Sequence, residues 1–223
     1  MQTIKEIYLK YQVPPNLQQH MLRVAGMAKI ISDNWIGDAL DINTLLISCL
    51  VHDMGNLLKF DLINKANFLG KEEKNIEYWK KVKEEMVQKY GPDEHKATAV
   101  ICKELKLNDK VFWIVENWGF GNFDKVMTSD NWEYKIAVYS DHRIGPFGIV
   151  SLQDRFAEQK KRYEQQKHAS VDLSAHLSDK SEALINCAFE VEKQLQANTQ
   201  KNLGGVSDQE LETSFKNFLE YKI

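Results

Sequence analysis

The hydrophobic positions of this 223-residue chain recur at helical spacing, and no alternating stretch is long enough to indicate a sheet. One apolar stripe of a helix that begins near Asn16 is formed by Leu17, Val24, Met27 and Ile31. His20 lies on this stripe or at its edge. We therefore expect an all-α fold in which His20 is on the buried side of its helix.

Capping signals and helix breakers predict the other helices. Thr3 and Glu6 form a capping box for a first helix, which the turn at residues 13–15 ends. Ser207 and Glu210 form a second box for a last helix. Further helices are predicted at residues 45–51, 72–90, 93–107, 110–117 and 132–144.

The composition becomes polar after about Gln165, and this change suggests two parts. We expect a core domain over residues 1–165 and a helical C-terminal appendage over residues 166–223 that packs on it. The pair Gly204 and Gly205 would allow the end of this appendage to move.

Two apolar helices end in ionisable residues. The helix at residues 45–51 has one hydroxyl and no other polar group, and it leads directly into His52 and Asp53. Gly55 suits the end of this helix, because glycine adopts the left-handed conformation without steric cost. Asp141 stands near the end of a second apolar helix. A buried, unpaired carboxylate is costly, so a partner must compensate it.

Composition and charge narrow the functional classes. The formal net charge of -3 gives no field that attracts polymeric nucleic acid, and the basic residues 160–162 are typical of a solvated helix face. No run approaches the roughly 18 apolar residues that span a bilayer, and the amino terminus lacks a signal-peptide pattern. We expect a cytoplasmic protein without a membrane partner, and the oligomeric state stays open.

The three cysteines lie far apart and form no CxxC motif, so neither a disulfide framework nor a zinc cluster is indicated.

Each acidic or histidine candidate has an ordinary explanation by itself, such as a hydrogen-bonded core histidine, or a pair between Asp141 and Arg143 or Arg155. Together, two imidazoles and two carboxylates form a mixed shell that suits Mn, Fe, Co, Ni or Mg better than structural zinc. The sequence thus predicts a divalent metal site.

Four segments resemble, in order, the HD-domain metal-dependent phosphohydrolases. They are HMLRVAGMAKII from His20, LVHDMGN around His52 and Asp53, DEHKATAVICKEL around His95, and YKIAVYSDHRI around Asp141. The resemblance covers about residues 15–165. Within the superfamily, the chain resembles small bacterial HD proteins that are similar to diadenosine tetraphosphate hydrolases.

The resemblance implies a helical bundle that cleaves phosphate esters or anhydrides, with a nucleotide as the expected small substrate. It implies that His20, His52, Asp53 and Asp141 are metal ligands. Since Asn117 stands where an imidazole would be expected for a second ion, we expect one tightly bound divalent ion. Such an ion polarises the phosphoryl oxygen and lowers the pKa of bound water, so that hydroxide can attack near neutral pH. Asp53 would orient that water as a catalytic residue.

Further residues receive roles from the same resemblance. His95 matches a histidine that acts on the substrate or on a second metal, although a solvent-facing position at the start of a helix is the alternative. Lys59, Lys96 and Arg143 are candidates to hold phosphate, and surface solvation explains each of them equally well.

Two departures from the family pattern affect the site. Asn56 stands where many relatives have a lysine, and this change removes a phosphate contact unless Lys59 supplies it one turn later. Asn117, a candidate substrate-binding residue, is the nearest polar counterpart of a histidine in relatives with two metals.

The loop at residues 118–123 could stack a nucleobase or pack on the core. A hydrolase, a catalytically idle ligand-binding sensor and a purely structural interaction protein are the three classes considered, and the intact ligand set argues against the last.

Overall fold

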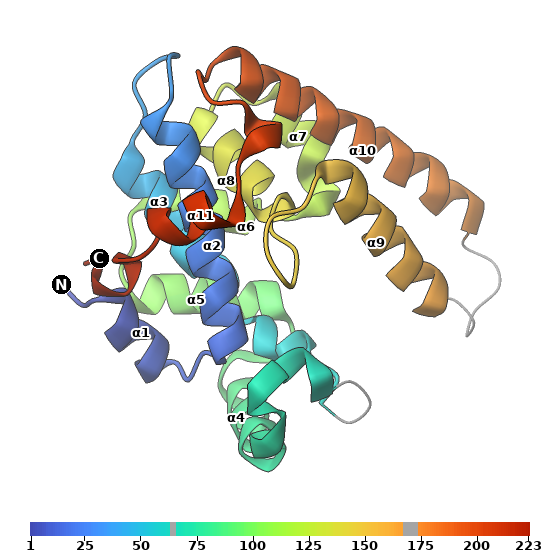
Figure 1. Cartoon of the computed structure of the whole chain (residues 1–223). Coiled ribbons are helices and arrows are strands. Elements are labelled where there is room, and N and C mark those ends of the chain that lie inside the picture. The colour runs from blue at the N-terminus through green and yellow to red at the C-terminus, as the bar shows by residue number, and fades with distance from the viewer. Residues whose placement is uncertain (63–65, 167–173) are drawn as a thin grey trace.

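The computed structural model describes residues 1–62, 66–166 and 174–223, and the regular elements in these residues are helices (Figure 1). The α-helices are α1 (Ile4–Lys10), α2 (Pro15–Asp33), α3 (Ile42–Val51), α4 (Ile76–Tyr90), α5 (Glu94–Glu104), α6 (Asp109–Glu116), α7 (Phe123–Thr128), α8 (Trp132–His142), α9 (Leu152–Gln166), α10 (Ser174–Ala197) and α11 (Asp208–Ser214). Short 3-10 helices include η1 (Asn56–Lys59), η2 (Ala66–Asn75), η3 (Phe120–Asn122) and η5 (Leu203–Gly205). The predicted all-α fold is confirmed.

Local signals account for most helix starts. Thr3 and Ser207 both form the capping boxes that the sequence predicts. Helix α2 begins at Pro15 and not at Asn16, because proline lacks the N–H that would be unpaired at the first helical position. Helix α4 begins later than expected, since the 3-10 helix η2 occupies the residues before it.

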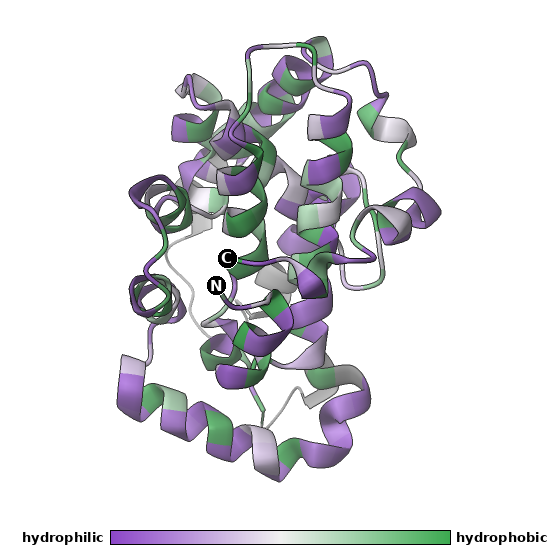
Figure 2. Ribbon diagram, turned by 90° about the vertical axis from the view of Figure 1, so that its left-hand side faces the viewer, coloured by the Kyte–Doolittle hydropathy of each residue, from purple (hydrophilic) through white to green (hydrophobic). Residues whose placement is uncertain are grey.

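The core lies where α2, α3 and α8 pack on one another, and α6 covers α3 from a further side. Side chains with no exposed surface from the three central helices include Met21, Val24, Met27 and Ile31 of α2, Leu45 and Leu50 of α3, and Ile136 and Val138 of α8. Figure 2 shows apolar residues concentrated in the central helices, whereas apolar and polar residues alternate along the outer ones. Among the described residues, no helix has the length and apolar character that a bilayer crossing requires.

Two helices of the C-terminal part, α10 and α11, pack against the rest of the fold. Helix α10 packs against α7 and α8 and buries Leu184, Ala188, Val191 and Leu195. Helix α11 then packs on α2, and the two chain ends lie side by side, since the N–H of Gln2 donates to the carbonyl of Ile223 over 3.0 Å (Figure 1). Helix α9 runs on to Gln166, so the domain boundary at residue 165 stays a prediction.

Candidate metal centre

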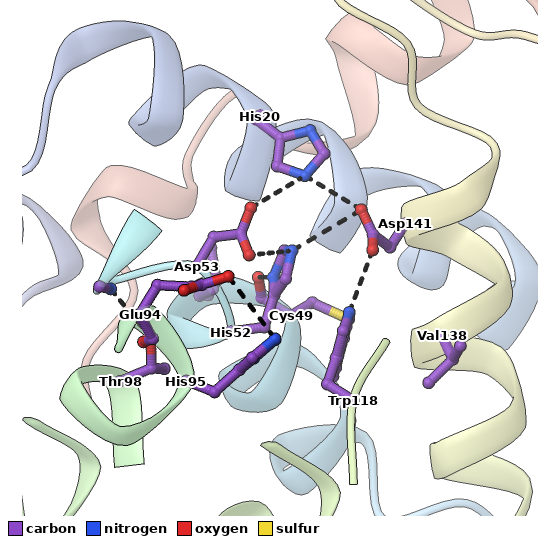
Figure 3. A network of polar contacts seen from close by, with 12 residues as sticks. His20, Cys49, His52, Asp53, Glu94, His95, Thr98, Trp118, Val138 and Asp141 are labelled. Carbon is purple, nitrogen blue, oxygen red and sulfur yellow. Dashed lines mark hydrogen bonds and ion pairs between the residues drawn. The ribbon is translucent and has the colours of Figure 1, made fainter. Parts of the chain in front are cut away.

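Three helices bring four of the predicted residues to one place (Figure 3). His20 comes from α2, His52 and Asp53 follow the last turn of α3, and Asp141 lies in the last turn of α8. The Nε2 atom of His20 is 3.0 Å from Oδ1 of Asp141 and 3.6 Å from Oδ2 of Asp53. The packing of α2, α3 and α8 therefore joins residues that are far apart in the sequence.

His52 is held so that one ring nitrogen faces the carboxylates. Its side chain is fully buried, and its Nδ1 lies 2.8 Å from the carbonyl oxygen of Cys49. Donation from Nδ1 to this carbonyl leaves a lone pair on Nε2 in the neutral ring. Nε2 lies 3.6 Å from Asp53 and 3.7 Å from Asp141, and it has no hydrogen-bond partner among the described residues.

This arrangement fits a divalent cation. His20, His52 and Asp141 each offer one ligand atom, and these atoms lie within 4.8 Å of one another. Asp53 stands beside this group, with Oδ2 towards His20 and Oδ1 towards His52. A buried imidazole nitrogen that has no hydrogen-bond partner among the described residues, together with a mixed nitrogen and oxygen donor set, is a feature that first-row transition ions favour.

The shifted pKa values of His52 and Asp141 also fit a cation site. Burial alone would lower the pKa of His52, but the charges of Asp53 and Asp141 outweigh it and raise that pKa to about 9. Burial alone would raise the pKa of Asp141, yet its contacts with His20 and His52 hold that pKa well below its ordinary value. A proton on His52 thus offsets carboxylate charge, and a bound cation can take over this function.

Trp118 is a site residue that the sequence analysis did not identify. Its indole N–H donates to Oδ2 of Asp141 over 3.1 Å, and its ring stacks on His52 with the centroids 4.4 Å apart (Figure 3). Trp118 and Phe123 of the 118–123 loop are both buried, as the core-packing alternative requires. The sequence marks a tryptophan at the end of a helix but does not indicate which way its ring points.

Gly55 does not adopt the left-handed conformation expected of it, so that prediction is wrong. Its φ is -89°, and α3 has already ended at Val51 with His52 as its cap. Glycine is needed here for close approach, because a β-carbon would lie 2.3 Å from the carbonyl oxygen of Glu94.

The remaining candidates lie outside this cluster. The side chain of His95, in the first turn of α5, is 68% exposed, and its Nε2 is 3.8 Å from a carboxylate oxygen of Glu94. Lys59 approaches the same oxygen to 3.4 Å, while Lys96 is 80% exposed near Asp93. The catalytic role of His95 and the phosphate-binding roles of both lysines stay predictions.

The Asn117 amide donates to the carbonyl of Trp113 over 2.9 Å, at the end of its own helix. A substrate-binding role would require this amide to leave that carbonyl, and the role stays a prediction.

Arg143 has a structural position, and the prediction that it binds phosphate is wrong. The residue is 2% exposed, and its guanidinium donates to the carbonyls of Val150 and Leu203 and to the hydroxyl of Tyr139. Glu192 lies 3.5 Å away and balances its charge. Arg143 therefore connects the end of α8 to the C-terminal part.

Comparison with known proteins gives one match. The family model described as HD domain matches residues 5–108, which include His20, His52, Asp53 and His95. Asp141 lies beyond the matched range, and the structure brings it to the same place. No curated protein and no solved structure matches the chain.

Proposed function

Because the chain belongs to the HD-domain superfamily, we propose that it is a metal-dependent phosphohydrolase. The bond that it cleaves is an ester or anhydride bond of a small phosphorylated molecule, and a nucleotide is the substrate we propose to test first. The proposal rests on the family match and on the geometry of the metal centre.

One observation carries the proposal. The buried Nε2 of His52 faces Asp53 and Asp141 but has no hydrogen-bond partner in the described part of the chain, and His20 completes the group from α2. A core histidine with only a structural role is normally hydrogen-bonded at its buried polar atoms. A cation held by His20, His52 and Asp141 accounts for this arrangement.

Each residue then has a definite role. When bound, the ion polarises a phosphoryl oxygen and lowers the pKa of water, so that a nucleophile is available near neutral pH. His20, His52, Asp53 and Asp141 would hold the ion. The side chain of Asp53 is 20% exposed, so one of its oxygens can orient the attacking water and accept its proton.

The substrate class is supported by the sequence resemblance and by the groups near the first turn of α5. Glu94 lies between Lys59 and His95, and these two residues supply a positive charge and a hydrogen-bond donor outside the four-residue cluster. Both are largely exposed and therefore free to turn towards a phosphorylated ligand.

The test is a turnover screen with a matched set of variants. Protein loaded with Mn, Co, Ni or Mg is assayed against nucleoside monophosphates, nucleoside diphosphates and dinucleoside polyphosphates. Asp53→Ala and Asp141→Ala should lose turnover and bound metal, whereas Asp124→Ala, on the exposed first turn of α7, should retain both. Ligand binding without turnover in every metal form would instead favour the sensor alternative.

A further inference from the structure

We propose that Trp118 is a positioning residue of the metal centre, which restricts Asp141 to one ligand oxygen and fixes the ring of His52. This inference rests on the metal site of the proposed function. Trp118 comes from the segment after α6 and is 7% exposed, yet it contacts side chains from α3 and α8 (Figure 3).

The hydrogen bond from Trp118 gives the two carboxylate oxygens of Asp141 different partners. Oδ2 accepts the indole N–H of Trp118 over 3.1 Å. Oδ1 lies 3.0 Å from Nε2 of His20 and 3.7 Å from Nε2 of His52. Because Trp118 occupies Oδ2, Oδ1 is the oxygen that faces the ion, and Asp141 binds through that atom alone.

The stacking contact limits the rotation of His52. The two rings are nearly parallel, with an angle of 15° between their planes. The Nδ1 atom of His52 is held at the same time by the carbonyl of Cys49. Two restraints in different directions leave Nε2 pointing at the carboxylates, and such outer contacts set the orientation of metal-binding histidines.

A packing role alone would not need the indole nitrogen. Phenylalanine supplies a similar aromatic face for His52 but no N–H for Asp141. Trp118→Phe therefore removes the hydrogen bond while it keeps the stacking. Trp113→Phe is the matched control, because Trp113 is 44% exposed on the preceding helix and its ring packs against Tyr134.

The experiment measures Co²⁺ binding to purified full-length protein by competition with a chromophoric chelator, and records the visible Co²⁺ spectrum. Trp118→Phe should bind Co²⁺ roughly tenfold more weakly, the lower end of what outer-shell substitutions cost. Its spectrum should change, because the freed Oδ2 can also bind and alter the coordination number. Trp113→Phe should match the wild type in both measurements.

A second measurement does not depend on the variant folding. In wild-type protein labelled with ¹⁵N at the indole nitrogens, five tryptophan signals are expected, and one of them should move distinctly when Zn²⁺ is added. An indole spectrum unchanged by bound Zn²⁺ would overturn the inference. So would wild-type Co²⁺ affinity and an unaltered spectrum in folded Trp118→Phe.

The failures of the two proposals are distinguishable. Wild-type protein that binds Co²⁺ but cleaves no phosphate compound would refute the hydrolase and leave the role of Trp118 standing. Wild-type protein that binds no divalent ion would overturn both.

Discussion

The hydroxyl oxygen of Thr98 accepts a hydrogen bond from the backbone N–H of Gly55 over 2.9 Å, and the same hydroxyl donates to the carbonyl of Glu94 (Figure 3). This contact attaches the turn that carries His52 and Asp53 to the start of α5. The turn can come this close because Gly55 has no side chain.

Gly55→Ala should therefore destabilise the protein and weaken its metal site. The new methyl group would lie 2.3 Å from the carbonyl of Glu94, and overpacking of this kind costs about 1–3 kcal/mol of unfolding free energy. Urea unfolding and a metal titration measure the two effects. Gly121→Ala is the control, since no atom of the residues that the structure describes lies within 4 Å of its added methyl group. Equal stability of the two variants would show that the turn moves aside without cost.

The sequence predicts the helices well because helix starts and apolar faces depend on local patterns. The capping box at Thr3 needs only residues three apart, and the apolar stripe of α2 places His20 towards the core. The convergence of His20 with Asp141 could be expected only through the family resemblance, because helix packing has no local signal.

The errors concern side chains whose partners come from distant segments. Arg143 looks like a free cation beside Asp141, yet its guanidinium binds Leu203 and Glu192 of the C-terminal part. Trp118 looks like a loop aromatic, yet its N–H has a carboxylate partner on α8. Nothing within a few residues of either position reveals these contacts.

The C-terminal segment should stabilise the fold without forming the metal site. Leu211 and Phe215 of this segment are buried, and Phe215 and Ser214 cover Gly26 of α2, beyond His20. Deletion of residues 207–223 should lower the unfolding free energy by several kcal/mol, because burial of each large apolar side chain contributes about 1.5–3 kcal/mol. The metal content of the folded fraction should stay unchanged.

Leu211→Ala is the milder companion, because it keeps the chain length and should cost about 2–5 kcal/mol. Unfolding curves and elemental analysis of both variants provide the measurements. Loss of metal from a truncated protein that remains folded would mean that the tail closes the site.

The metal-free protein should lose stability as the pH rises from about 6.5 to 9. The folded-state pKa of His52 is raised to about 9 from 6.5, so the folded protein binds more protons than the unfolded chain across this window. The stabilisation of the folded state by protonated His52 is complete below pH 6.5 and is lost as the pH passes 9. The loss amounts to as much as about 3 kcal/mol, since one pKa unit corresponds to about 1.4 kcal/mol.

Urea unfolding in the presence of a chelator at pH 6 and pH 9 measures this loss directly. Protein saturated with metal should not show it, because the ion replaces the proton on His52. Calorimetric titration with metal at pH 7 in two buffers of different ionisation enthalpy should accordingly show proton release. A metal-free protein of constant stability from pH 6.5 to 9 would contradict the charge balance inferred for His52.

The site should hold one tightly bound divalent ion per chain. A second ion would need donors beyond Asp53, but His95 is 68% exposed beside Glu94, and the amide of Asn117 is bound to the carbonyl of Trp113. A neutral amide also binds first-row transition ions weakly, so an ion held there exchanges readily. Elemental analysis of protein purified without chelator should give a ratio near one, and His95→Gln should leave this ratio unchanged even if it slows turnover. A ratio of two in the wild type that falls to one in His95→Gln would instead identify His95 as a ligand of a second ion.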